Sequence, residues 1–155
     1  MAYVVNFAHH LEIDGVPLST PAWEHLNIQA LYGGAYVRGE NRVLPGAAGK
    51  RALPWRPDET MRTLTLAIFG ARSWDGTTNA DPVAGLWANV AHLHSFVVNN
   101  PLNATSTRTA TIKRPGFDDL VATIQVRGFE IDDEPYSTGD VAATLDIALV
   151  QGAFT

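Results

Sequence analysis

The sequence predicts a mainly β protein, an antiparallel β-sandwich with one flanking α-helix, built as a single domain over residues 1–155. Three observations support this prediction. A length of 155 residues suits one domain with its own core and is too short for two of ordinary size. Three segments alternate apolar and polar residues with the period of a half-buried strand. One further segment repeats its apolar residues at helical spacing.

The first eighty residues contain most of the glycines and prolines, so they predict short strands joined by long connections. The candidate strands in this half are residues 2–7, 11–13, 27–31 and 35–38. A clearer strand follows at 61–69, where Leu64, Leu66 and Ile68 fall on one face and the residues between them on the other.

Two more strands are predicted at 120–131 and 141–150. The link between them, residues 132–140, is acidic and rich in turn-forming residues, so we expect an antiparallel hairpin with a long solvated tip. The expected inner residues are Leu120, Ala122, Ile124 and Val126 in the first strand, and Val141, Ala143, Leu145, Ile147 and Leu149 in the second.

The segment 81–98 predicts the flanking helix. Asp81 is placed to cap its N-terminus, and Pro82 occupies the first helical position, where a missing N–H costs nothing. The stripe expected to face the core is Val83, Leu86, Trp87, Val90, His94 and Val97.

A long loop is predicted at about 33–57. A loop of this length inside a compact domain is usually functional or ordered by a partner. It is rich in Arg and Lys, whereas the loop at 132–140 is rich in Asp and Glu. In a ring, the basic loop of one subunit could dock against the acidic loop of the next. The residues alone equally allow an unattached surface loop.

No residue pattern supports catalysis, a cofactor or a metal. The absence of cysteine excludes disulfides, thiolate metal sites and thiol nucleophiles. His92 and His94 would lie on opposite sides of the helix, and the adjacent His9 and His10 on opposite sides of a strand, so neither pair could share an ion. The acids cluster in one exposed loop, and the serines lack the sequence context of a nucleophile. We therefore expect no enzyme and no cofactor.

The charge balance argues against nucleic acid as the main partner. The formal net charge is -5, and the chain has no basic run that could follow a phosphate backbone. No apolar run approaches the roughly 18 to 20 residues that span a bilayer, so no membrane contact is expected. Carbohydrate binding through Trp55 and Trp74 stays open as an alternative, because flat aromatic rings can stack on sugars.

Residues 42–51 (RVLPGAAGKR) and 58–66 (DETMRTLTL), followed by Gly70, resemble the N-terminal domain of the distal tail proteins (Dit) of siphophages and the related minor tail proteins of actinobacterial phages. In that family a Pro-Gly-x-x-Gly loop leads through a polar turn into a strand with alternating leucines. The C-terminal half also fits, with a strand ending at Glu130, an alternating ATLDIAL strand and a final GAF. The resemblance covers residues 10–155.

This resemblance implies a tail-tube-like β-sandwich that assembles into a hexameric ring around the DNA channel at the tail tip. The implied partners are other copies of the chain, the tail tube, the tail-associated tip protein and the tape measure protein, with DNA only in transit. The protein would be part of the virion and would assemble in the host cytoplasm. Because the sequence stops soon after Phe154, we expect no second, galectin-like domain. A major tail tube subunit of the same fold is the alternative.

The resemblance also suggests two sets of functional residues. An acidic lumen would repel phosphates and let DNA slide, so polar outward residues of one sheet are expected to face the channel. The expected channel-facing residues are Thr123, Gln125, Thr144 and Asp146. The expected inter-subunit contacts are Arg38, Arg42, Pro45, Gly46, Gly49, Lys50, Arg51, Trp55, Asp132, Asp133 and Glu134.

Overall fold

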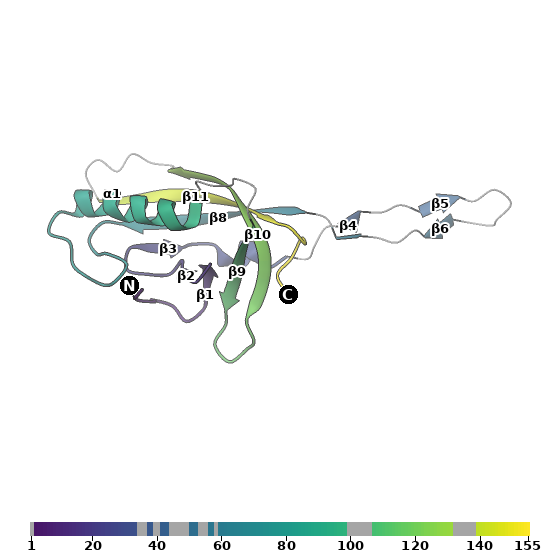
Figure 1. The fold of residues 1–155 in the computed structure, drawn as a ribbon, viewed down its shortest axis with the longest axis horizontal. Helices are drawn as coiled ribbons and strands as arrows, with labels where there is room; N and C mark the ends of the chain where they lie inside the picture. Colours follow the sequence, from purple (N-terminus) through teal and green to yellow (C-terminus); the bar gives the residue numbers. More distant parts are fainter. Residues whose placement is uncertain are drawn as a thin grey trace.

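The computed structural model describes residues 2–33, 37–38, 41–43, 50–52, 56–57, 59–98, 107–131 and 139–155. Within this part, seven strands form one antiparallel sheet in the order β2-β1-β9-β10-β11-β8-β3 (Figure 1). The strands are β1 (His10–Ile13), β2 (Val16–Pro17), β3 (Trp23–His25), β8 (Thr60–Phe69), β9 (Arg108–Lys113), β10 (Leu120–Ile131) and β11 (Asp140–Leu149). The predicted mainly β class with one flanking helix is confirmed.

The centre of the sheet is formed by the three strands that the sequence predicted most clearly. β11 pairs with β8 from Asp140 opposite Phe69 to Leu149 opposite Thr60, and β10 pairs with the other side of β11. Alternate residues of β8 and β11 are buried, as the two-residue period requires. The predicted antiparallel hairpin of β10 and β11 is therefore confirmed, while its tip, 132–138, lies outside the described residues.

A β-bulge divides β10 into two halves. The predicted inner residues Ala122 and Ile124 are buried, but the pairing with β11 shifts between Val126 and Gly128. A bulge inserts one extra residue and so changes which side chains face inward. Beyond it, Phe129 and Ile131 take over the packing against the core.

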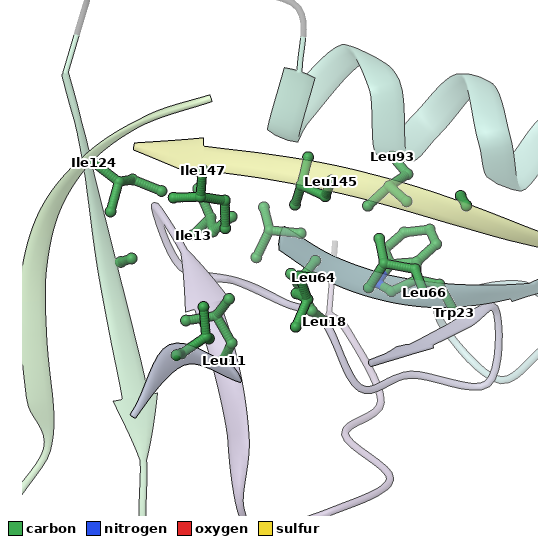
Figure 2. Packing of buried hydrophobic residues seen from close by; sticks show 14 of the residues in the cluster. Leu11, Ile13, Leu18, Trp23, Leu64, Leu66, Leu93, Ile124, Leu145 and Ile147 are labelled. Atoms are coloured by element: carbon green, nitrogen blue, oxygen red, sulfur yellow. The ribbon is translucent and has the colours of Figure 1, made fainter. Parts of the chain in front are cut away.

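The core lies inside the curl of this single sheet. Leu11 from β1 and Ile124 from β10 are fully buried in the same cluster as Leu64 from β8 and Leu145 from β11 (Figure 2). The two layers of the predicted sandwich thus come from one continuous sheet that bends over its own apolar face. Burial of each such side chain contributes roughly 1.5–3 kcal/mol.

The helix α1 (Pro82–Leu93) continues into a π-helical turn, η2 (His94–Val98), so the predicted range is confirmed. Its N-terminus is capped as expected, because the Asp81 carboxylate accepts hydrogen bonds from the backbone N–H groups of Val83 (3.1 Å) and Ala84 (3.4 Å). The predicted core stripe is rotated, however. Trp87, expected in the core, has 49% of its surface exposed. The buried residues of α1 are Gly85, Leu86, Asn89 and Leu93.

Two specific contacts fix this rotation of α1. A methyl group on Gly70 would overlap the Pro82 carbonyl, so the first helical turn lies directly on the end of β8. Asn89 is fully buried, and its Nδ2 donates to the backbone carbonyls of Phe69 (2.6 Å) and Arg72 (2.8 Å). These contacts turn the Asn89 side of the helix inward and leave Trp87 outside.

Several predictions for the first half were wrong. Residues 2–7 are irregular, and 27–31 contains a 3₁₀ turn, η1 (Ile28–Leu31), in place of a strand. There the side chain of Asn27 substitutes for a strand partner. Its Oδ1 accepts from the Thr65 N–H (2.7 Å), and its Nδ2 donates to the Thr63 carbonyl (3.3 Å). The strands β2, β3 and β9 were not predicted.

The predicted loop at 33–57 contains paired strands where it is described. β4 (Val37–Arg38) pairs with β7 (Arg56–Pro57), and β5 (Asn41–Val43) pairs with β6 (Lys50–Ala52), both antiparallel. We call these four strands the arm. In Figure 1 the arm lies beyond the end of the sheet, with β5 and β6 farthest from it. The predicted strand at 35–38 corresponds to β4, with residues 35 and 36 outside the described part.

Candidate assembly surfaces

The side of β8, β10 and β11 that faces away from the core carries a band of polar residues, which we call the outer polar face. The register places Asp146 beside Thr63 and Thr144 beside Thr65 on β8. The Thr63 hydroxyl donates to Asp146 Oδ1 at 2.9 Å. On the other side of β11, Glu130 lies opposite Thr144. Directly opposed residues of an antiparallel pair point to the same face.

The outer polar face includes all four residues predicted to face a channel. Thr123 and Gln125 lie on β10, and Thr144 and Asp146 on the neighbouring β11. Their outward orientation follows from the alternation in both strands, which buries Ile124 and Leu145 on the opposite side. That this face borders a channel stays a prediction.

One charged cluster lies on this face. Arg127 Nη2 donates to both carboxylate oxygens of Glu59 (3.2 Å each) and to Gln125 Oε1 (2.6 Å). The two side chains of the ion pair are 45% and 43% exposed, so the pair contributes at most about 1 kcal/mol to stability. With Glu130 and Asp146 nearby, this face has more acids than bases.

The predicted inter-subunit residues are described only in part. Arg38, Arg42, Lys50 and Arg51 lie on strands of the arm. The remaining predicted contacts lie outside the described residues: Pro45, Gly46, Gly49, Trp55, Asp132, Asp133 and Glu134.

The register of the arm sets like charges against each other. Arg42 lies directly opposite Arg51, and Arg38 directly opposite Arg56. Like charges in directly opposed positions destabilise a strand pair. The sequence pattern alone could not show this opposition of arginine positions, because it depends on the register of the strands.

A second surface feature is a hollow of about 250 Å³ beside the start of β1 and the end of β9. It is lined by His9, Tyr32, Arg114, Pro115 and Phe117. His9 Nε2 lies 2.7 Å from the Tyr32 hydroxyl, and the Arg114 guanidinium lies over the Phe117 ring at 5.6 Å. The sequence offered no signal for this hollow because its residues come from three separate segments.

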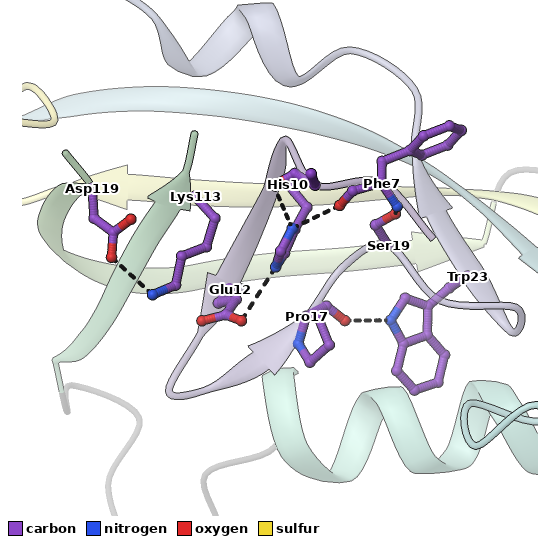
Figure 3. Close-up of polar contacts among 9 residues, drawn as sticks. Phe7, His10, Glu12, Pro17, Ser19, Trp23, Lys113 and Asp119 are labelled. Carbon is purple, nitrogen blue, oxygen red and sulfur yellow. Dashed lines mark hydrogen bonds and ion pairs between the residues drawn. The ribbon is translucent and has the colours of Figure 1, made fainter. Parts of the chain in front are cut away.

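Each of the five histidines contacts another side chain of the fold. His10 is buried while its neighbour His9 is exposed, and the His10 ring lies 2.8 Å from the Phe7 carbonyl and 3.2 Å from Glu12 (Figure 3). No group of three or more His, Asp or Glu in the described ranges could hold a metal ion.

One face of the Trp74 ring is covered by the ring of His92. The two rings stack with centroids 3.6 Å apart and an interplanar angle of 7°. His92 Nε2 also lies 2.9 Å from the Tyr3 hydroxyl, and burial lowers the pKa of His92. This arrangement argues against Trp74 as a sugar platform, while Trp55 lies outside the described residues.

No helix in the described part of the chain is long and apolar enough to cross a membrane. The chain matches no protein-family model and no curated protein sequence. Its fold is similar to that of a solved phage protein, SPP1 Dit, described as a paradigm of the hub adsorption apparatus in phages that infect Gram-positive bacteria. That likeness has a TM-score of 0.52 at 14% identity and covers 92% of this chain. The chain has a Dit-like fold.

The Dit-like fold of this chain spans 50% of the length of SPP1 Dit. Two structures of gene transfer agent particles also match, one of the tail of an empty particle with C6 symmetry and one of the native virion. Each has a TM-score of 0.42, at 7% and 10% identity. Both matches cover 96% of this chain, and they cover 94% and 95% of the matched chains.

Proposed function

We propose that this chain is a structural component of a siphophage tail, a Dit-like protein that forms a hexameric ring around the DNA channel at the tail tip. The observation that carries this proposal is the Dit-like fold over 92% of the chain. Fold alone does not define function. Two features of the surface add support, namely the arm and the outer polar face.

The arm suits contact with another subunit. Its strands project beyond the sheet (Figure 1), and both of its strand pairs oppose one arginine to another. An acidic neighbour would relieve this repulsion. The acidic residues Asp132, Asp133 and Glu134 of the next subunit would supply that charge. A contact between two different surfaces of identical subunits is heterologous, and such contacts generate rings when the rotation closes.

The outer polar face suits the wall of a channel for DNA. Three acids, Asp146, Glu130 and Glu59, lie there with one base, Arg127, so these residues carry a net negative charge. A negative lumen repels phosphates and leaves DNA free to slide without specific binding. Other tail proteins, namely the tail tube, the tip protein and the tape measure protein, would border the ring.

A major tail tube subunit of the same fold is the second candidate. The Dit-like fold covers 50% of the length of SPP1 Dit, and a fold that two proteins share does not by itself distinguish between their functions. The two candidates differ in polymerisation, because a tube subunit stacks its rings into open-ended tubes.

Light scattering and negative-stain electron microscopy of the purified chain test the proposal. We expect discrete rings with six-fold symmetry and six times the mass of one chain. Open-ended tubes with the same ring as their repeat would support the tail tube subunit. A chain that stays monomeric up to high concentration, both alone and with purified tail tube protein, would contradict both candidates.

A further inference from the structure

We propose that Glu59 and Gln125 mask the positive charge of Arg127, so that the outer polar face offers no cation that could hold a nucleic-acid phosphate. This inference deepens the proposed function and rests on it, because it takes the outer polar face as the wall of the channel through which DNA passes. Arg127 is the group that would retain DNA, and Glu59 and Gln125 are the positioning residues that prevent this.

Arg127 has a singular place on the outer polar face. It is the only arginine or lysine among the outward positions of β8, β10 and β11, all of which the structure describes. Arg62 lies on the other face of β8, together with the buried Thr60 and Leu64. A basic side chain that neutralises a phosphate releases counterions from DNA and so adds to affinity for any sequence. Among these described positions, Arg127 is therefore the one able to hold DNA.

The bulge in β10 directs Arg127 onto this face. Val126 pairs with Ile147 and Gly128 pairs with Asp146, so Arg127 is the extra residue between the two pairs. Val126 packs against the core, whereas Arg127 is exposed. Bulges re-aim side chains in this way. The position of the arginine on the face is thus defined by the backbone of β10.

Two side chains hold the guanidinium of Arg127. Its Nε and Nη2 donate to Gln125 Oε1 at 3.1 and 2.6 Å, and Nη2 also donates to both carboxylate oxygens of Glu59 at 3.2 Å each. A guanidinium binds an oxyanion most strongly through two parallel N–H groups, and Nη2 belongs to both of the nitrogen pairs that can do so. Gln125 and Glu59 therefore occupy donors that a phosphate would need, and Glu59 also neutralises the charge.

The ion pair crosses the width of β11. This strand lies between β10, which carries Arg127, and β8, which begins just after Glu59. On β11, Ala148 is in register with Gln125 on one side and Met61 on the other, and alternation turns its side chain outward. Ala148 is nevertheless fully buried and does not belong to the core cluster. Outward side chains around it therefore cover it, which fits a bridge of side chains lying flat on the strand.

The number of copies makes the masking matter. An exposed ion pair adds little to the stability of one chain. In a ring, however, every copy would present the same unmasked arginine to the DNA. Roughly six to ten phosphate contacts change the affinity for DNA by about 10³–10⁵-fold between about 50 and 200 mM salt. One unpaired base in each copy would thus be enough to turn a sliding surface into a binding surface.

DNA binding by variants of the chain tests this role. Glu59→Ala removes the carboxylate and leaves Arg127 in place. We expect its affinity for a short labelled DNA duplex, measured by fluorescence anisotropy at about 50 mM salt, to be about fivefold or more above that of the unaltered chain. The gain should shrink roughly 3-fold for each engaged phosphate contact when the salt is raised to about 200 mM. Basic residues elsewhere contribute equally to both chains, so the difference reports Arg127.

The matched control is Asp119→Ala. It removes the acid of another exposed ion pair, in which Lys113 Nζ lies 2.8 Å from Asp119 Oδ2 at the turn between β9 and β10 (Figure 3). The net charge changes by the same amount, and the affinity for DNA is expected to stay unchanged. The double variant Glu59→Ala/Arg127→Gln should return to the affinity of the unaltered chain, which a merely structural role of Glu59 would not produce.

Three results would each overturn the inference, namely an unchanged affinity of Glu59→Ala, an equal gain in Asp119→Ala, or a gain that persists in the double variant. Self-association of the unaltered chain is measured separately. Rings that form while Glu59→Ala gains no affinity would refute the masking role and spare the proposed function. A chain that stays monomeric while Glu59→Ala gains affinity would support the masking role and contradict the proposed function.

Discussion

Replacing Asn89 by Asp tests whether its side-chain amide holds α1 against the sheet. Asn89 is fully buried and donates two hydrogen bonds from Nδ2, to the carbonyls of Phe69 and Arg72. Aspartate has the same shape but no donor, so at neutral pH it turns a carboxylate oxygen toward two carbonyl oxygens. The substitution therefore changes the chemistry of the contact while leaving its packing intact.

The expected loss follows from these contacts. Each lost hydrogen bond that leaves a buried group unpaired costs roughly 1–3 kcal/mol, and the unpaired buried carboxylate adds to this. We expect the free energy of unfolding of Asn89→Asp to fall by about 3 kcal/mol or more at pH 7. In a domain of this size that corresponds to a lower melting temperature by roughly 6–12 °C.

Urea unfolding followed by tryptophan fluorescence measures the loss. The matched control is Ala88→Asp, which adds the same charge one residue away on the exposed side of α1 and is expected to change stability by about 0.5 kcal/mol or less. Desolvation raises the pKa of the buried acid in Asn89→Asp, so its destabilisation should shrink as the pH falls toward 4. Equal stability of Asn89→Asp and Ala88→Asp at pH 7 would show that the amide does not anchor the helix.

Three further outcomes are expected. Deletion of residues 42–51 should leave a folded monomer and abolish ring formation, and a hexamer that survives the deletion in light scattering would contradict the role of the arm. Gly70→Ala should destabilise the fold by roughly 1–3 kcal/mol in urea unfolding, because the methyl group overlaps the Pro82 carbonyl. Because burial lowers the pKa of His92, its contribution to stability should be constant above about pH 6.5 and fall below it, by at most about 1.4 kcal/mol per pH unit, with a further contribution of the same sign from His25, whose pKa burial also lowers. His92→Phe should reduce this dependence, and leave the part due to His25, in melting curves recorded from pH 7.5 to 5.5; an unchanged slope would mean that His92 does not titrate differently on folding.

The candidate surfaces could be predicted only in part. The outward orientation of Thr144 and Asp146 follows from alternation, so the sequence was sufficient to place them on one face. The opposition of Arg42 to Arg51 depends on the register of β5 and β6, which periodicity does not define. The exposure of Trp87 could not be predicted, because the spacing of this residue also fits the apolar stripe of α1 that was expected to face the core.

Local patterns determined the long elements of this protein. The alternation in β8, β10 and β11, and the Asp81-Pro82 start of α1, each act within one segment of the chain, so the residues there are enough to specify them. These elements also define the mainly β class with one helix.

Tertiary structure alone decided how those elements meet. Gly70 and Asn89 fix the rotation of α1 through contacts with residues outside the helix, and the bulge in β10 resets which side chains face the core. The short strands β2 and β3 exist only through their partners, because two or three residues have too little local preference to hold an extended conformation alone. Such pairings depend on residues far apart in sequence, so they cannot be predicted from a local sequence pattern.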